Sequence, residues 1–333
     1  MTLITPTFCL TSGIKLEMTL AFVFPGQGSQ TVGMGRALAQ SFSQARATFE
    51  EGDDALGHPL SRLMFEGPQA ELTLTEHAQP ALMAVSMAAI RVLEGEFGKS
   101  LSGISRFVAG HSLGEYSALA AAGTFTLEDV ARVLRIRGQA MQQAVPVGFG
   151  AMVAIVGLEL DAAETVVAEA ACGQVCEVAN DNTPDQVVLS GDAAAIQRAC
   201  GLAIERGARR CVPLPVSAPF HCSLMRPAGK IIAQELATTE MSPPVVPLIS
   251  NVTATPIAEP GELRKLLVRQ VTARVRWRES VLCLRREGIK TIVECGVGKV
   301  LSGLVRRIDR DLKIVSLGTP EDIETFVVGR YLE

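Results

Sequence analysis

The chain has 333 residues, of which 48% are hydrophobic and 20% charged, and its mean hydropathy is +0.28. This apolar content excludes a disordered chain, and the length allows about two structural units of roughly 150 residues each. The 31 basic and 35 acidic side chains give a net charge of −4, which excludes a protein that binds nucleic acid over its whole surface.

The N-terminal 17 residues lack a basic stretch followed by a long apolar one, so they do not predict a signal peptide. We expect 1–17 to be an extension, disordered or derived from an upstream start, because Met18 directly precedes the first predicted strand. The longest apolar run, 81–90, is about half of the roughly 20 residues that a membrane span needs. We therefore expect no membrane segment.

Strand-like and helix-like stretches alternate along the chain, which predicts an α/β protein with a mostly parallel sheet. The helix that contains 81–90 is apolar on nearly every side and is expected to be buried. The predicted strands of the main sheet are 20–24, 107–109, 245–250, 291–294 and 313–317. The predicted helices around it are 34–51, 76–95, 114–122, 127–144, 223–238, 277–287, 299–309 and 320–328.

The pattern of predicted strands and helices changes between 146 and 215, a segment that begins at Pro146 and ends at Pro215. Its predicted elements follow the order β-α-β-β-α-β, which is that of a ferredoxin-like unit. We therefore predict one large unit made of 18–145 and 216–333, with the small unit 146–215 inserted into it. The predicted elements of the small unit are strands 151–156, 175–179, 186–190 and 210–214, and helices 161–171 and 192–206.

Gly110-His111-Ser112-Leu113-Gly114 follows a predicted strand and precedes a predicted helix. G-x-S-x-G in this setting predicts a tight turn that exposes the Ser112 hydroxyl at the top of the sheet. The amide groups at the following helix start can stabilise an oxyanion. The alternative is a purely structural turn.

A nucleophilic serine needs a base, and the sequence has four histidines, at 58, 77, 111 and 221. His111 adjoins Ser112 on the turn and should point away from its hydroxyl. His221 lies in a proline-bracketed loop before a helix, where an imidazole can reach the edge of the sheet. We therefore favour His221 as the base over a structural histidine.

Arg137 lies on the apolar face of a predicted helix, four residues from both Val133 and Met141. An unpaired buried charge costs several kcal/mol, so this guanidinium requires an acidic partner. That partner is either a carboxylate of the protein or a carboxylate of the substrate. Helical periodicity alone does not choose between them.

A glycine-rich turn, Phe24-Pro25-Gly26-Gln27-Gly28-Ser29-Gln30, follows the first strand. It matches neither the phosphate-loop nor the dinucleotide pattern, because Met34 replaces the lysine of the first and Thr31 the third glycine of the second. A backbone N–H of this turn could complete an oxyanion hole with that of Leu113.

The segment 261–310 carries 13 basic and 5 acidic side chains. Its net charge of +8 has two explanations: a docking surface for an acidic partner, or charged helix faces exposed to solvent. Eight cysteines occur without a C-x-x-C pair or a Cys/His set at zinc spacing. We therefore expect no metal site and a reducing compartment, the cytoplasm.

Several of these stretches together resemble the malonyl-CoA:acyl carrier protein transacylase family. They are FPGQGSQ, GHSLGE, RG-x-x-MQ-x-AVP, SAPFHC and QVTARVRW, which occur here in the family order and span most of the chain. The resemblance implies an α/β-hydrolase-like large subdomain and a ferredoxin-like small one. It also implies transfer of a malonyl group from malonyl-CoA to an acyl carrier protein, for fatty acid synthesis, by a ping-pong mechanism through a malonyl-serine, with no cofactor.

The resemblance also implies roles for individual residues. Ser112 is the nucleophile, His221 the base, and Arg137 the group that holds the malonyl carboxylate. The N–H groups of Gln27 and Leu113 form the oxyanion hole, and Gln270 orients His221 through its main-chain carbonyl. Asn180, Asn182 and His111 line the cleft, and the Phe220 ring fills the space of a 2-methyl group. The carrier protein is expected to dock on 261–310, and we expect a monomer.

The first rival function is a serine esterase or thioesterase, which normally needs an acidic residue between the serine and the histidine in sequence. Asp129, Asp181, Asp185 and Asp192 are available, but none follows a predicted strand of the large unit. The second rival is an inactive scaffold that only docks a carrier protein. The presence of Ser112, His221 and Arg137 together argues against this second rival.

Overall fold

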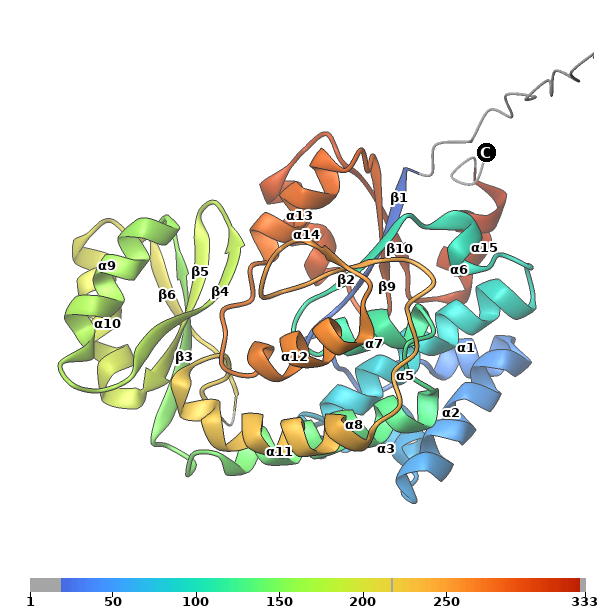
Figure 1. The fold of residues 1–333 in the computed structure, drawn as a ribbon, viewed down its shortest axis with the longest axis horizontal. Helices are drawn as coiled ribbons and strands as arrows, with labels where there is room; N and C mark the ends of the chain where they lie inside the picture. Colours follow the sequence, from blue (N-terminus) through green and yellow to red (C-terminus); the bar gives the residue numbers. More distant parts are fainter. Residues whose placement is uncertain (1–18, 217, 330–333) are drawn as a thin grey trace, which may run out of the picture.

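The computed structural model describes residues 19–216 and 218–329, which form two sheets of different character (Figure 1). The predicted extension 1–17 lies outside these residues. The larger sheet has the order β10-β9-β1-β2-β7-β8, in which only β8 runs antiparallel to its neighbour. Its strands are β1 (Leu20–Phe24), β2 (Phe107–Gly110), β7 (Leu248–Ile249), β8 (Pro256–Ile257), β9 (Thr291–Cys295) and β10 (Lys313–Leu317).

Both faces of the parallel sheet are buried under helices. Alternate residues of β1 point to opposite faces, so Phe22 and Phe24 belong to one core cluster while Ala21 and Val23 belong to another. The helices of this unit are α1 (Arg36–Ser41), α2 (Ser43–Leu56), α3 (Leu60–Glu66), α4 (Gln69–Leu72), α5 (Thr75–Gly95), α6 (Leu101–Ile104), α7 (Gly114–Ala121), α8 (Leu127–Gln143), α11 (Arg226–Thr238), α12 (Pro260–Gln270), α13 (Trp277–Arg286), α14 (Val300–Ile308) and α15 (Pro320–Val328), with a 3-10 turn at Ser223–Met225. In the part of the chain that the structure describes, no helix combines the length and apolarity that a bilayer crossing demands.

The smaller sheet is antiparallel, with the order β4-β5-β3-β6, and lies to the left in Figure 1. Its elements are β3 (Gly150–Val156), α9 (Leu160–Ala171), β4 (Cys176–Thr183), β5 (Gln186–Asp192), α10 (Ala193–Glu205) and β6 (Arg210–Pro213). This chain order confirms the predicted β-α-β-β-α-β unit beside a mostly parallel sheet. The boundaries at 146 and 215 stay a prediction.

Two sequence-based expectations about elements were wrong in detail, and several elements were not predicted. The helix predicted over 34–51 is interrupted at Phe42, which is extended (φ −131°) and packs its ring against Phe97. The strand predicted over 245–250 shortens to β7, which pairs through two residues with β2. The elements α3, α4, α6, α12 and β8 were not predicted; in α12, four of the eleven residues are charged and the buried ones form only a narrow stripe.

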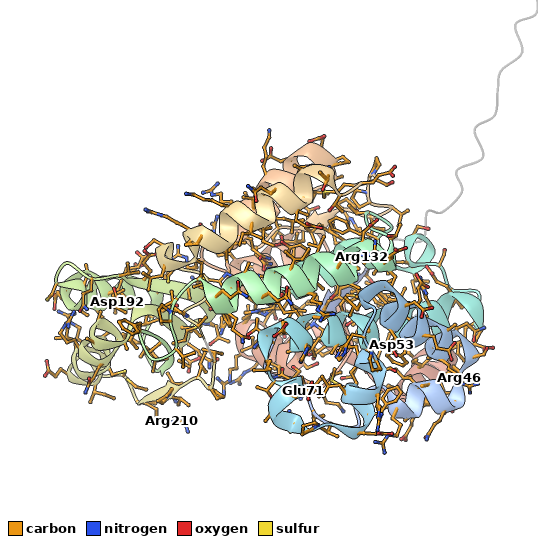
Figure 2. All side chains as sticks on the ribbon, turned by 90° about the horizontal axis from the view of Figure 1, so that it is seen from below. Arg46, Asp53, Glu71, Arg132, Asp192 and Arg210 are labelled. Atoms are coloured by element: carbon orange, nitrogen blue, oxygen red, sulfur yellow. The ribbon has the colours of Figure 1, made fainter. Side chains whose placement is uncertain are left out.

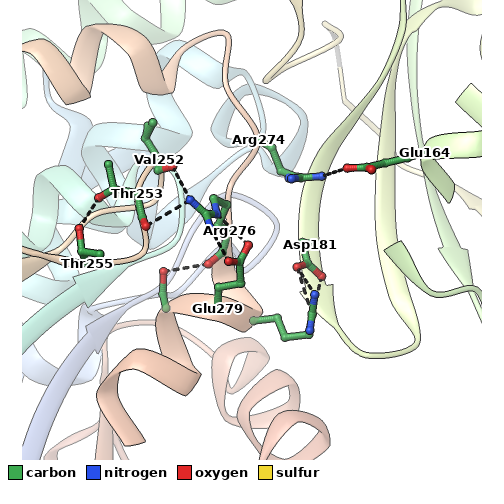
Figure 3. A network of polar contacts seen from close by, with 10 residues as sticks. Glu164, Asp181, Val252, Thr253, Thr255, Arg274, Arg276 and Glu279 are labelled. Carbon is green, nitrogen blue, oxygen red and sulfur yellow. Dashed lines mark hydrogen bonds and ion pairs between the residues drawn. The ribbon is translucent and has the colours of Figure 1, made fainter. Parts of the chain in front are cut away.

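A short segment between α12 and α13 fastens the small unit to the large one. Val275 exchanges backbone hydrogen bonds with Ala179 and Asp181 of β4. Two ion pairs flank this contact, one between Arg274 and Glu164 and one between Arg278 and the fully buried Asp181 (Figure 3). The segment therefore holds the end of β4 next to the carboxyl edge of the parallel sheet.

Candidate active site

The turn between β2 and α7 presents the Ser112 hydroxyl at the carboxyl end of β2. Ser112 has φ +55°, a left-handed conformation that is uncommon outside glycine and that marks strained functional turns. A Cβ on Gly110 would lie 1.9 Å from the Gly114 carbonyl carbon, and one on Gly114 would lie 2.1 Å from the Phe24 carbonyl oxygen. The two glycines are therefore required by the close packing of this turn.

Ser112 and His221 are hydrogen-bonded, with 2.7 Å between Oγ and Nε2. The other ring nitrogen of His221, Nδ1, lies 2.9 Å from the main-chain carbonyl oxygen of Gln270. Because a carbonyl can only accept, Nδ1 carries the proton and Nε2 presents its lone pair to the serine. His221 is itself in the left-handed region (φ +57°), so both partners are held in strained conformations.

The imidazole of His221 is neutral at pH 7. Burial lowers its pKa to about 3, and the nearby positive charge of Arg137 acts in the same direction. A neutral imidazole with a free lone pair on Nε2 is the form that can take a proton from a hydroxyl.

Arg137 reaches this pair from α8 and is almost fully buried, with 1% of its surface exposed. Its Nη1 donates to Gln79 Oε1 at 2.8 Å, while Nη2 donates to Gln270 Oε1 at 2.9 Å and to Ser112 Oγ at 3.1 Å. All of these acceptors are neutral, and across residues 19–216 and 218–329 no carboxylate forms an ion pair with Arg137. The internal salt bridge that the sequence left open is thus absent from the described residues.

Sequence reasoning missed three residues, of which two hold the turn and one holds Arg137. Asn251 accepts from the Ser112 N–H at 2.8 Å and donates to the Gly110 carbonyl at 2.6 Å. The buried Glu115 accepts from the Asn251 N–H at 2.9 Å and from Gln270 Nε2 at 2.5 Å. Burial raises the pKa of Glu115 to about 7. Gln79, the third, accepts from Arg137. Glu115 lies in the GHSLGE stretch but was given no role, and Asn251 and Gln79 carried no local sequence signal.

Gln27 and Leu113 lie on the cavity that contains Ser112, and Leu113 immediately precedes α7. The backbone N–H of neither residue has an acceptor among the hydrogen bonds of the described residues. Two free amide donors beside a nucleophile, one of them at a helix start, have the chemistry of an oxyanion hole.

The cavity has a volume of about 250 Å³ and opens between the two sheets. His111 points away from Ser112, as predicted: its Nε2 lies 2.9 Å from Asn182 Oδ1 and 3.2 Å from Asn180 Nδ2, and its ring packs against Trp277. Phe220 is nearly buried and forms part of the apolar wall.

The structure thus brings the sequence-predicted residues together. Nine of them line this cavity, and the tenth, Gln270, lies behind it in contact with Ser112, His221 and Arg137. The arrangement can deprotonate a serine, stabilise an oxyanion and bind an anion within one small cavity. The roles of the individual residues stay predictions.

Comparisons with known proteins identify similar chains. A family model described as "Acyl transferase domain" matches residues 21–312. The malonyl CoA-acyl carrier protein transacylase of Bacillus subtilis is 44% identical over 307 residues, which cover 92% of this chain and 95% of that protein.

Two solved structures are also similar. The acyl-carrier-protein-S-malonyltransferase of Bartonella henselae is 52% identical with a TM-score of 0.92, over 95% of this chain and 99% of that one. A malonyl-transacylase solved in complex with a type II polyketide acyl carrier protein is 40% identical with a TM-score of 0.89, over 92% of this chain and 98% of that one.

Proposed function

Since the chain belongs to the acyl transferase domain family, and within it to the malonyl-CoA:acyl carrier protein transacylases, we propose that it transfers malonyl groups. It takes the malonyl group from malonyl-CoA and delivers it to the phosphopantetheine thiol of an acyl carrier protein, which supplies extender units for fatty acid synthesis. The observation that carries the proposal is Arg137, a buried guanidinium beside the Ser112 hydroxyl with only neutral acceptors around it.

In the first half-reaction, His221 removes the proton of Ser112, and Oγ attacks the thioester carbonyl of malonyl-CoA. The N–H groups of Gln27 and Leu113 stabilise the tetrahedral oxyanion. The C–S bond then breaks, and His221 returns the proton to the departing sulfur. The products are malonyl-Ser112 and coenzyme A.

In the second half-reaction, the thiol of the carrier's phosphopantetheine gives its proton to His221 and attacks the serine ester. Collapse of the intermediate returns the proton to Ser112 Oγ and leaves malonyl on the carrier. Both steps exchange one ester-type bond for another without any change in oxidation state, so the proposed reaction requires no redox cofactor.

Arg137 gives the reaction its preference for an acyl group with a free carboxylate. A substrate carboxylate bound to Nη2 of Arg137 lies next to Ser112 Oγ. This contact holds the thioester carbonyl in the same pose for both half-reactions. The Phe220 ring narrows the cavity on its apolar side and therefore disfavours the binding of a branched acyl group.

The carrier protein docks, in this proposal, on part of the basic segment 261–310. Arg274, Arg276, Arg278 and Arg285 of this segment are already paired with acidic side chains. Arg307 and Arg310 instead line a hollow of about 660 Å³ together with Arg209 and Arg210 of the small unit. The hollow and the cavity draw on the same segments of the chain: Gln186 and Leu304 line the cavity, while Asp185 and Arg307, next to Gln186 and one turn after Leu304, line the hollow.

We place the reaction in the cytoplasm. All seven cysteines that the structure describes are free thiols, which suits a reducing compartment.

The proposal is tested by incubating the full chain with malonyl-CoA, with and without a holo acyl carrier protein, and measuring carrier mass and free malonate. A transferase malonylates the carrier and releases little malonate when the carrier is absent. Rapid malonate release without the carrier would indicate a thioesterase instead. Neither product would indicate a scaffold that only docks the carrier.

A further inference from the structure

A second cluster of reactive side chains lies outside the active site, among helices α2 to α5. It consists of His58 in the loop between α2 and α3, Glu71 in α4, and His77 in the first turn of α5. One potential ligand atom from each residue lies within 4.8 Å of the other two. The cluster can be located from Glu71 in Figure 2.

One of the two imidazoles, that of His77, has its tautomer set by a hydrogen bond. Nδ1 of His77 lies 3.0 Å from the main-chain carbonyl oxygen of Glu71, so it carries the proton and leaves the lone pair on Nε2. A metal-binding histidine characteristically donates its other ring N–H to such an acceptor. The contact also fixes the His77 ring against α4.

His58, the second imidazole, has a ring nitrogen that lacks a hydrogen bond. Its Nε2 is buried and has no acceptor or donor in the described part of the structure. A buried polar atom without a partner destabilises the fold. A ligand that bonds to this nitrogen removes that cost in addition to forming the new bond. The His58 and His77 rings stack with centroids 5.5 Å apart and planes inclined by 22°.

The loop around His58 is short and is held by backbone hydrogen bonds. The His58 N–H donates to the Asp53 carbonyl, and its carbonyl accepts from the Leu60 N–H at the start of α3. The imidazole is therefore carried by a fixed turn between two helices, so a ligand set that includes it is largely preformed.

We propose that His58, Glu71 and His77 form a binding site for a divalent transition metal, with Zn²⁺ the best fit. Two neutral imidazoles and one carboxylate suit zinc and its neighbours, whereas calcium and magnesium prefer sites made wholly of oxygen ligands. Three protein ligands leave the fourth tetrahedral position to water. The prediction of no metal, drawn from cysteine and histidine spacing, could not detect ligands that meet only through the packing of α4 against α5.

The ion would act on the start of α5 and not in the transfer chemistry. The same first turns of α5 carry Gln79, which accepts from Arg137, and Glu76, which accepts from Gln139 of α8. Binding at His77 therefore stabilises the helix that supports the buried arginine. The inference does not depend on the transfer reaction.

The test uses the full untagged chain, stripped with a chelator and then titrated with Zn²⁺ alone in competition with a chromophoric zinc indicator. We expect one tight site per chain and a rise in melting temperature on binding. Glu71→Gln and His58→Gln should each weaken that site by about tenfold or more. Glu66→Gln removes an exposed carboxylate of α3 outside the cluster and should bind as the parent does.

Co²⁺ spectra of the same proteins separate this site from the free cysteines. The proposed site gives visible ligand-field bands that disappear in Glu71→Gln and lack the near-ultraviolet thiolate band. Unchanged zinc affinity in both Glu71→Gln and His58→Gln, or a cobalt spectrum dominated by thiolate, would overturn the proposal. Circular dichroism of each stripped variant checks that it is folded.

Discussion

Arg137 brings a positive charge into the cavity that no ion pair neutralises among the described residues; the carboxyl of Glu115 acts on it only from behind Gln270, to which both side chains are hydrogen-bonded. The contacts of Arg137 are the neutral oxygens of Gln79, Gln270 and Ser112, and its ring neighbour is Tyr116, 5.4 Å from the guanidinium carbon. Keeping such a charge buried is costly, and in the proposed reaction the malonyl carboxylate would supply its partner.

We therefore expect Arg137→Ala to depress malonyl transfer far more than acetyl transfer. Loss of a charge-assisted pair should cost malonyl-CoA about 10- to 100-fold in kcat/KM beyond any loss for acetyl-CoA. Acetyl-CoA lacks the carboxylate and serves as the internal control for damage to the fold or to Ser112. Equal losses for both substrates would contradict the proposed role of Arg137.

The pH dependence of the reaction provides a second residue-scale prediction. The pKa of His221 is held near 3 by burial and by Arg137, so the imidazole stays neutral, and competent as a base, well below its ordinary value of 6.5. We expect kcat/KM for malonyl-CoA to show no acid limb between pH 8 and about 5.

Glu115 needs a control in this measurement, because its raised pKa, about 7, falls within the same range. The profile is therefore measured for the parent and for Glu115→Gln. An acid limb near 6.5 in both proteins would show that the free-enzyme base titrates as an ordinary histidine, contrary to the account.

Some site residues could be predicted from sequence and others could not. Ser112 has a local pattern and Arg137 a helical periodicity, so both could be singled out. Asn251 contacts the Ser112 backbone across 139 residues of sequence, and its own flanking residues suggest only a loop. Such a contact depends on the parallel pairing of β7 with β2, which brings residues far apart in the sequence to the same edge of the sheet.

At the scale of elements, the strand-turn-helix around Ser112 depends on two glycines. We expect Gly114→Ala to destabilise the protein by about 2 kcal/mol or more, because its Cβ would meet the Phe24 carbonyl oxygen. Denaturant unfolding followed by circular dichroism measures this change.

The matched control is Gly201→Ala in α10, where a new Cβ meets nothing within 4 Å. This change should leave stability equal or raise it by about 0.5–1 kcal/mol, because alanine favours a helix. Similar unfolding curves for the two variants would show that the turn tolerates a side chain at Gly114.

Element prediction succeeded where periodicity was strong and failed where tertiary contacts set the limits. The apolar run 81–90 predicted a buried helix, and α5 is buried along most of its length. By contrast, the break at Phe42 is set by packing on Phe97, and β7 ends where its pairing with β2 ends. Neither limit is visible in local composition.

At the scale of the whole molecule, residues of both units line the cavity, and arginines of both units gather in a neighbouring hollow. Arg209 pairs with Asp185, whereas Arg210, Arg307 and Arg310 form no ion pair among the described residues. Positive charge beside an active-site mouth favours the approach of an acidic partner.

We expect the double variant Arg307→Glu/Arg310→Glu to raise the KM for the carrier protein by about tenfold while leaving the KM for malonyl-CoA nearly unchanged. The control is Arg46→Glu, an exposed arginine that Figure 2 shows at the opposite end of the molecule from Arg210. Steady-state kinetics at low salt measure both constants. An equal rise in both would argue against this surface as the dock.

The central claim is that malonyl passes through Ser112, and intact-mass spectrometry of the full chain mixed with malonyl-CoA tests it most directly. We expect the mass to rise by one malonyl group, peptide mapping to place it on Ser112, and holo carrier protein to remove it. Ser112→Ala should acquire no mass. No adduct on the parent, or an adduct on another residue that the carrier discharges, would contradict the account.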